Sequence, residues 1–320
     1  MKLSIFTALA ALLFAASQPV MAENVKITAL GSNQGELCQL DRAMVLEDPD
    51  GTRILYDPGR TVAGASDSRL GKIDAILVSH MHGDHVGDKH IESVSNGECS
   101  TAKFPLKSLP NTNLVNIALA KNAKIITGSE MPKFFANKLK ALGGDPKNSQ
   151  LVRFGASRKI GGVSITTVPA VHSNGISGGM IEGELGNMLN AAGLTAYAGP
   201  PTGYVLTFSN GLAVYLSGDT GVTAEQDTVV RQLYNEKLVV MNIGDTFTTG
   251  PEEAAWVVNK LIKPKSVIPS HANQPSTSGG KVIEGTRVDT FIKATKAKVH
   301  LPLSGRTMAF NNKGKCVDGC

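Results

Sequence analysis

The stretch Asp74-Ala-Ile-Leu-Val-Ser-His-Met-His-Gly-Asp-His85 joins an unbroken apolar run to a cluster of polar side chains. The run Asp74–Ser79 predicts a buried β-strand, because a strand covered on both faces shows no polar alternation. Four polar residues follow it where a strand gives way to a loop, so their side chains can converge: His80, His82, Asp84 and His85. Imidazoles and carboxylates are the ligands that zinc and similar divalent metals take in proteins. The stretch therefore predicts a metal site at a strand end.

Three further polar residues come directly after apolar, strand-like runs: His172 after Val163–Val168, Asp219 after Leu212–Leu216, and His271 after Val267–Pro269. Taken singly, each would be an ordinary loop residue. Because the same context recurs three times after the first cluster, we expect all three to belong to the same site.

Two histidines are left over by this pattern. His90 lies in a polar segment and is predicted to be a surface residue, and His300 is predicted to occupy a late strand.

The other elements alternate in a way that indicates one α/β domain with a sandwiched sheet. Strands are expected at Val25–Leu30, Ala43–Glu47, Arg53–Tyr56, Lys124–Thr127, Tyr204–Phe208, Leu238–Ile243 and Ser266–Ile268. Helices are expected at Met131–Leu142, from the capping box at Thr223 to about Asn235, and from Pro251 to the stop at Lys263-Pro264. No repeat and no low-complexity linker divides the chain.

Composition excludes several classes of protein. The chain has 320 residues, of which 42% are hydrophobic and 18% charged, with a formal net charge of +5. That is enough apolar content for one sizeable core or at most two small ones, and too much for a disordered chain. Lysine and arginine are scattered, so charge does not indicate nucleic-acid binding. Nothing in the sequence indicates an oligomeric state.

The first residues have the pattern of a signal peptide. Met1-Lys2 precedes the apolar run Leu3–Ala16, and small residues lead to a cleavage site after Ala22. The run is shorter than the roughly 20 residues that span a bilayer. We therefore expect a signal peptide at 1–22 and a domain at 23–320, periplasmic or secreted and without stable membrane insertion.

Export decides how the four cysteines are interpreted. An even number in an oxidising compartment indicates disulfides, and no pair has the C-x-x-C spacing of a zinc ribbon. The Val-Asp-Gly spacer between Cys316 and Cys320 permits a tight loop. The predicted pairs are therefore Cys316 with Cys320 and Cys38 with Cys99.

The order of the motifs, from His80-x-His82-x-Asp84-His85 through His172 and Asp219 to His271, resembles the metallo-β-lactamase superfamily over essentially the whole mature chain. Val78–Asp88, Ser217–Thr220 and Asn242–Gly250 are most similar to a branch of bacterial metal-dependent hydrolases related to lactonase-like members. The resemblance implies a four-layer αββα sandwich and a metal-dependent hydrolase acting on a small molecule.

Position by position, the resemblance implies two divalent ions. One would be held by His80, His82 and His172, the other by Asp84, His85 and His271, with Asp219 between them. Zinc suits such a site best, although manganese and iron occupy similar shells. Asp57 matches an early aspartate that orients a ligating histidine, and Asp245 lies in a similar strand-end context.

The implied chemistry is hydrolysis by a hydroxide held between the two ions. Asp84 is the candidate catalytic residue, orienting the nucleophile and passing a proton to the leaving group. An aspartate at position 219 is usual in lactonases, thioesterases and phosphodiesterases of the superfamily and usually absent from its true β-lactam hydrolases. The alternatives are a phosphodiesterase, a β-lactam-hydrolysing member, a mononuclear iron redox member and a non-catalytic metal-binding protein.

The stretch Ser173–Gly203 resembles an insertion. It holds eight glycines and two acids and lacks lysine and arginine, and helical spacing inside it stops at Gly193. One interpretation is a surface loop packed on the core; the other is a lid over the site, with Met180, Leu185, Met188 and Tyr197 as pocket walls. A lid without cations would favour a neutral carbonyl substrate, such as a lactone, ester or thioester, over a phosphodiester.

Overall fold

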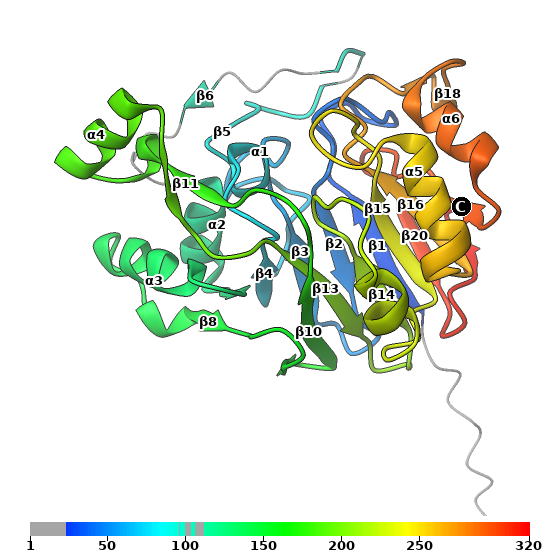
Figure 1. The fold of residues 1–320 in the computed structure, drawn as a ribbon, viewed down its shortest axis with the longest axis horizontal. Helices are drawn as coiled ribbons and strands as arrows, with labels where there is room; N and C mark the ends of the chain where they lie inside the picture. The colour runs from blue at the N-terminus through cyan, green and yellow to red at the C-terminus, as the bar shows by residue number, and fades with distance from the viewer. Residues whose placement is uncertain (1–23, 96, 100–103, 106–111) are drawn as a thin grey trace, which may run out of the picture.

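The computed structural model describes residues 24–320 except 96, 100–103 and 106–111 (Figure 1). The predicted signal peptide at 1–22 lies outside the described residues. Among the helices that are described, none has the length and apolar character needed to cross a membrane.

Eight strands form the first sheet, in the order β21-β20-β1-β2-β3-β4-β7-β8. The pairs from β21 to β3 are antiparallel, and β3, β4, β7 and β8 run parallel. The bounds are β1 (Val25–Ala29), β2 (Met44–Glu47), β3 (Arg53–Tyr56), β4 (Ala75–Leu77), β7 (Lys124–Thr127), β8 (Ser149–Leu151), β20 (Thr307–Phe310) and β21 (Cys316–Asp318).

Seven strands form the second sheet, in the order β19-β16-β15-β14-β13-β10-β9. β14, β15, β16 and β19 are parallel, and β13 runs antiparallel to both β10 and β14, so β10 and β14 point the same way. The bounds are β9 (Ser157–Ile160), β10 (Val163–Pro169), β13 (Thr202–Thr207), β14 (Ala213–Leu216), β15 (Leu238–Asn242), β16 (Ser266–Ser270) and β19 (Lys298–Val299).

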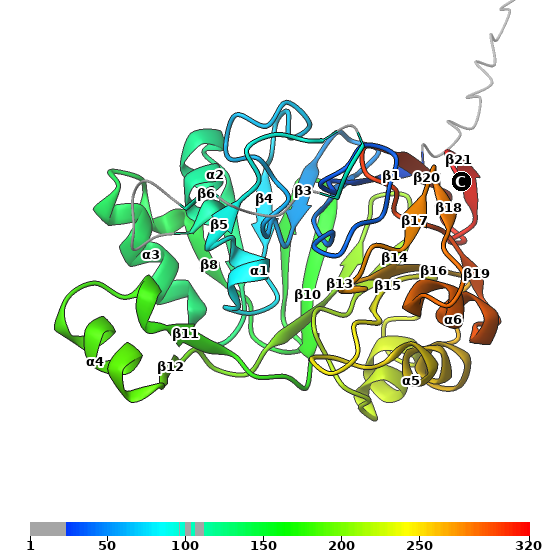
Figure 2. The same ribbon diagram turned by 90° about the horizontal axis from the view of Figure 1, so that it is seen from above.

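Helices cover the outer face of each sheet (Figures 1 and 2). Outside the first sheet lie α2 (Asn113–Lys121) and α3 (Met131–Ala141), and η1 (Pro146–Asn148) follows them. Outside the second lie the π-helical turns η3 (Gln226–Arg231) and η4 (Val257–Ile262), together with α5 (Pro251–Trp256) and α6 (Arg287–Ala294). One apolar cluster fills the space between the sheets, and one lies under each helical layer. The four-layer αββα sandwich is confirmed.

Local sequence explains where the elements begin and end. Half of the predicted capping box is present: the Thr223 backbone N–H donates to Gln226 Oε1 at 3.0 Å, but Thr223 Oγ1 has no partner among the described residues. The helix that it opens is the π-helical η3 rather than a regular helix extending to Asn235. β4 ends at Leu77, two residues earlier than predicted, because the Ser79 N–H donates to the side chain of Asp57 instead of a neighbouring strand. The remaining short elements are α1 (Gly83–Val86), β5 (Lys89–His90), β6 (Phe104–Pro105), β17 (Thr277–Ser278) and β18 (Lys281–Val282).

The insertion at 173–203 forms a hairpin of β11 (Gly175–Ser177) and β12 (Thr195–Tyr197), with η2 (Gly178–Met180) and α4 (Glu184–Ala192) at its end. The predicted helical stop is confirmed, because Gly193 caps α4 with φ of 66°. α4 projects beside α3, on the side of the molecule away from α5 (Figures 1 and 2).

Both predicted disulfides are present, one between Cys38 and Cys99 and one between Cys316 and Cys320. The first links residues 61 positions apart, from the loop after β1 to the loop after β5, and so restricts the unfolded chain more than the second.

Glu236, which precedes β15, gives a prediction about stability. Its carboxylate oxygens are buried without hydrogen-bond partners among the described residues, and burial raises its pKa to about 8 from 4.5. The folded state therefore binds this proton more tightly than the unfolded state, so stability is lost as pH rises from about 4.5 through 8. Glu236→Gln should remove this loss and stabilise the protein at pH 9 by up to about 4 kcal/mol.

Urea unfolding followed by circular dichroism at pH 5 and pH 9 measures the effect. The exposed Glu252→Gln serves as the matched control and should keep the wild-type pH profile. Equal stabilisation by Glu236→Gln at both pH values would contradict a neutral, buried Glu236.

Candidate metal centre

The polar residues predicted from strand ends meet at one edge of the sandwich. His80 and His82 follow β4, and Asp84 and His85 lie in α1 directly after them. The second sheet contributes the other three, with His172 after β10, Asp219 after β14 and His271 after β16. Because these strands run in the same direction within each sheet, their carboxyl ends reach the same edge.

The carboxylate of Asp219 lies at the centre of the cluster. Its Oδ2 faces the Nε2 atoms of four histidines: His271 at 3.1 Å, His85 at 3.4 Å, His172 at 3.7 Å and His80 at 3.9 Å. His82 joins from the side, with its Nδ1 3.3 Å from His172 Nε2. Asp84 Oδ2 lies 3.4 Å from His271 Nε2 and 3.7 Å from His85 Nε2.

These distances fit metal ligands better than hydrogen bonds. Ligands at 2.0–2.1 Å around a tetrahedral zinc are about 3.3 Å apart, near the middle of the observed range. The Nε2 atoms of His80, His85 and His271 and Asp219 Oδ1 are buried without hydrogen-bond partners among the described residues. Three overlapping sets have ligand atoms within 4.8 Å of one another: His80 with His82 and His172, Asp84 with His85 and His271, and His80 with His85 and Asp219.

Asp57 and Ser79 contact two of the histidines, His85 and His80, at the ring nitrogen that faces away from Asp219. The resemblance implied such a contact for Asp57. Asp57 Oδ2 accepts a hydrogen bond from His85 Nδ1 at 2.8 Å, and Asp57 also accepts from the N–H and Oγ of Ser79. Ser79 Oγ in turn lies 2.9 Å from His80 Nδ1. These contacts hold both rings with Nε2 toward Asp219, which is the usual role of residues behind a metal ligand.

The backbone around the site is tightly constrained. Asp57 and His271 adopt left-handed φ values of 38° and 55°, uncommon for residues other than glycine and frequent at functional sites. A Cβ on Gly244 would lie 2.6 Å from His271 Nδ1, and one on Gly218 would lie 2.8 Å from the Cβ of Ser79. Both glycines are therefore required for the ligand-bearing loops to pack together.

The charges of the site suit a dication. Burial, assisted by the charge of His85, holds the pKa of His80 well below its ordinary value, so this imidazole is neutral. Burial opposes ionisation of Asp219, but His85 and His271 lower its pKa well below the usual range. Burial likewise opposes protonation of His85, yet Asp219, Asp57 and Asp84 raise its pKa to about 10. A bound cation would balance the negative charges of Asp219, Asp57 and Asp84 in place of a proton on His85.

Comparison with known proteins identifies the family. A family model described as a β-lactamase superfamily domain matches residues 37–271. A UPF0173 metal-dependent hydrolase of Cupriavidus necator is 32% identical over 243 residues, which cover 72% of this chain and 71% of that protein. The chain belongs to the metal-dependent hydrolases of the β-lactamase superfamily. A second relative with the same UPF0173 description, from Koribacter versatilis, is 28% identical over 226 residues, covering 70% of this chain and 77% of that protein.

Solved structures share the fold of this hydrolase. Igni18, a metallo hydrolase from Ignicoccus hospitalis, matches with a TM-score of 0.57 and 23% identity over 90% of this chain and 99% of that one. The metallo-β-lactamase fold protein YhfI from Bacillus subtilis matches with a TM-score of 0.55 and 13% identity over 90% and 100% of the two chains. The diiron β-hydroxylase CmlA matches with a TM-score of 0.54 and 11% identity over 92% and 55%. At these identities the matches establish the fold alone.

A cavity of about 580 Å³ opens onto the cluster of the hydrolase. Besides five of the predicted ligands, its lining residues include two arginines and two apolar side chains that sequence reasoning missed: Arg42, Arg60, Leu40 and Phe247. A signal for Arg60 was available, since it follows the predicted strand 53–56 within Asp57-Pro-Gly-Arg60. Phe247 carried no such signal, because only the folded loop after β15 brings it to the cavity.

The predicted pocket walls in the insertion are wrong. Met180 is buried in the core beneath the first sheet's helices, and Leu185, Met188 and Tyr197 are solvent-exposed, Tyr197 by 77%. Of the stretch 173–203, Ser173 alone lines the cavity. The insertion instead contacts α3, where Lys138 of α3 forms an ion pair with Glu182 of the insertion at 3.6 Å. The insertion is therefore a surface arm, and its lack of cations says nothing about the substrate.

The structure also places Asp245 and the two remaining histidines. Asp245 is exposed and accepts a hydrogen bond from the N–H of Thr246, so it does not orient a ligating histidine as predicted. His90 is half-buried on β5, with its Nδ1 against the Ile91 carbonyl. His300 is buried directly after β19, beside the disulfide of Cys316 and Cys320.

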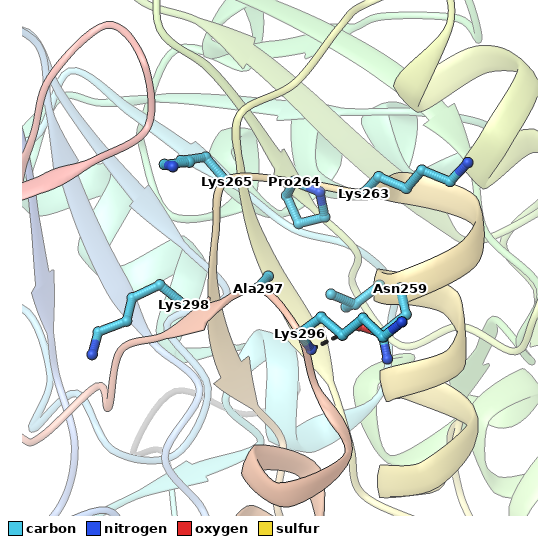
Figure 3. A pocket seen from close by; sticks show the side chains of 8 residues that line it. Asn259, Lys263, Pro264, Lys265, Lys296, Ala297 and Lys298 are labelled. Carbon is cyan, nitrogen blue, oxygen red and sulfur yellow. Dashed lines mark hydrogen bonds between the residues drawn. The ribbon is translucent and has the colours of Figure 1, made fainter.

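A second cleft, of about 450 Å³, is drawn in Figure 3. Its lining includes Lys265, just before β16, and Lys298, the first residue of β19, whereas His271 of the metal centre follows the other end of β16. Four lysines line the cleft, and Lys265 and Lys298 extend to one side while Lys263 extends to the other. Their charges therefore do not converge on one point, and the cleft offers no ligand set for a metal.

Asp57→Asn tests how the histidines are oriented. The amide cannot accept from Ser79 and His85 as the carboxylate does, so zinc affinity should fall by roughly 10–100-fold. Competition with a chromophoric chelator measures the affinity. Asp245→Asn is the matched control and should bind zinc as the wild type does; a loss of equal size in both variants would contradict the role of Asp57.

Proposed function

We propose that this protein is an exported hydrolase that uses two divalent ions, zinc first among them, to cleave a carbonyl bond of the lactone, ester or thioester class. The observation that carries the proposal is the position of Asp219 Oδ2, within 3.1–3.9 Å of the Nε2 atoms of four histidines from both sheets. Two ligand sets lie close to this oxygen, His80 with His82 and His172, and Asp84 with His85 and His271, and each could hold one ion.

Bound there, two divalent ions would lower the pKa of a water and polarise the carbonyl under attack. His80, His82 and His172 would hold one ion, and Asp84, His85 and His271 the other. The chain supplies the rest: Asp57 and Ser79 keep the imidazoles in place, and the surrounding apolar clusters exclude bulk water from behind the site.

Asp84 is the residue proposed to handle the proton. It lines the cavity, and Arg42 Nη2 lies 2.9 Å from its Oδ2. Although burial opposes ionisation, His85 and Arg42 lower the pKa of Asp84. An ionised carboxylate at this point accepts a hydrogen bond from the attacking water and holds the proton until the leaving group takes it.

The residues that line the cavity, rather than those of the insertion, support a carbonyl substrate. Leu40 and Phe247 supply apolar wall, and Arg42, the arginine beside the proposed metal ligands, is already paired with Asp84. Arg42, the arginine in contact with a proposed ligand, also donates to the Leu40 carbonyl and Asn273 Oδ1. A reacting phosphodiester would need an uncommitted cation at that point.

The first test removes a ligand. Asp219→Ala and His82→Ala should lower the metal content from about two ions per chain, with kcat/KM falling more than about a hundredfold. Elemental analysis and circular dichroism are measured on the same preparations. His90→Ala, which lies outside the cluster, is the control, and full metal content in Asp219→Ala would refute the two-ion arrangement.

The second test compares substrates on metal-loaded protein. A lactone and an aryl acetate should be hydrolysed with kcat/KM roughly tenfold or more above that for bis(p-nitrophenyl) phosphate, and nitrocefin should be a poor substrate. A preference for the phosphodiester would overturn the carbonyl assignment.

Export is tested separately. The disulfide between Cys38 and Cys99 is typical of oxidising compartments and supports it. We expect the mature protein, isolated from the periplasm or medium, to begin at Glu23. Recovery of the full-length chain from the cytoplasm alone would contradict this.

A further inference from the structure

Arg60 lies on the wall of the metal-centre cavity with part of its guanidinium uncommitted. Its Nε and Nη2 donate to the two carboxylate oxygens of Asp88 at 2.7 and 2.9 Å. Those two bonds use one edge of a group that carries five N–H donors. Among the described residues, the side-chain hydrogen bonds of Arg60 all go to Asp88. The other edge of the guanidinium, formed by Nη1 and the second N–H of Nη2, can therefore bind a ligand.

The two arginines of the cavity differ in this respect. The Arg42 side chain is 3% exposed and bonds Asp84, Asn273 and the Leu40 carbonyl. The Arg60 side chain is 24% exposed. Arg42 therefore positions residues of the protein, whereas Arg60 is the cation that a molecule entering the cavity can reach.

Asp88 gives Arg60 a fixed orientation. The Asp88 N–H donates to the Gly83 carbonyl, and a Cβ on Gly83 would lie 2.5 Å from the Asp88 carboxyl carbon, so this carboxylate is packed against α1. A guanidinium held along one edge loses little further freedom when its second edge binds a planar anion in two parallel hydrogen bonds. The two N–H donors of that second edge match the two oxygens of a single carboxylate.

Phe247 supplies the apolar surface of the same cavity. It is 70% exposed, unusual for a phenyl ring, and it follows two residues with left-handed φ values, Asp245 at 54° and Thr246 at 57°. The loop is anchored on both sides of the ring, by Gly244 N–H to Thr248 Oγ1 and by Thr249 Oγ1 to the Thr220 carbonyl. Strained backbone thus holds an aromatic ring at the cavity, where it can cover the apolar part of a substrate.

We propose that the natural substrate carries a carboxylate separate from the bond that is cleaved, bound by the Nη1/Nη2 edge of Arg60, with Phe247 covering the carbon chain between them. This inference rests on the proposed carbonyl hydrolysis and narrows its substrate to anionic esters or lactones. A cavity of about 580 Å³ accommodates a small molecule of that kind.

The test uses paired substrates with one leaving group. The mono-p-nitrophenyl esters of succinate, glutarate and adipate are compared with the same esters whose free carboxylate is capped as a methyl ester. For the best chain length, we expect the wild type to favour the free carboxylate by about 10–100-fold in kcat/KM, chiefly through KM. Equal kcat/KM for the capped and uncapped members at all three lengths would overturn the inference.

Variants assign the preference to a residue. Arg60→Gln should reduce the ratio of uncapped to capped kcat/KM about tenfold or more, and Arg60→Lys should restore only part of it, because an ammonium cannot form the two-bond fork. Arg158→Ala, an exposed arginine on β9, is the matched control and should keep the wild-type ratio. Glutarate titrated calorimetrically should bind Arg60→Gln about tenfold more weakly than wild type. An unchanged ratio in a folded, metal-loaded Arg60→Gln would refute the role of Arg60.

The ester experiments test carbonyl hydrolysis and the carboxylate site separately. If metal-loaded protein hydrolyses neither capped nor uncapped esters but does cleave bis(p-nitrophenyl) phosphate, carbonyl hydrolysis itself is wrong. If it hydrolyses both esters without discrimination, carbonyl hydrolysis stands and the carboxylate site is refuted.

Discussion

A buried carboxylate surrounded by imidazoles is the constraint on which the rest of this structure depends. Asp219 Oδ2 lies 3.1 Å from His271 Nε2 and 3.4 Å from His85 Nε2, and Asp219 Oδ1 has no partner among the described residues. Burying such groups without a cation is costly, so the arrangement is stable only where positive charge is supplied. A bound metal would supply that charge, so the residues that make the fold stable are also those proposed to carry the activity.

The two sheets meet that requirement through the direction of their strands. One sheet brings His80, His82 and Asp57 to the edge at the ends of β4 and β3, and the other brings Asp219 and His271 at the ends of β14 and β16. The apolar cluster between the sheets holds the two halves of the site in register. A core variant far from the metals can therefore weaken the site, because small shifts between the sheets separate ligands that no covalent bond links.

The proposed substrate contacts come from different parts of the chain than the proposed metal ligands. The ligands follow strands whose apolar sequence forces them into the interior, whereas Arg60 and Phe247 come from loops that reach the cavity only after the sandwich has assembled. The insertion at 173–203, for which the sequence left a surface loop and a lid open, packs beside α3 as a surface segment. Its hairpin pairs with itself and buries Ile176 and Met180 in the outer core, so its remaining apolar residues stay exposed.

The sequence, together with the family resemblance that its motifs carry, predicted the αββα fold, the clustering of seven polar residues, the place of Asp57 behind them and both disulfides. The clustering and the shorter disulfide follow from short-range patterns, namely apolar runs that end in a polar residue and the tight Cys316–Cys320 loop. The four layers and the place of Asp57 came from the resemblance to the metallo-β-lactamase superfamily. Only the tertiary structure decided that Met180 is core, that Asp245 faces solvent, and that Arg42, Arg60 and Phe247 line the cavity. The reason is physical. The sheet fixes where a buried strand ends, and so it also fixes the position of the residue that follows. The position of a loop residue depends instead on contacts with segments far away in the sequence.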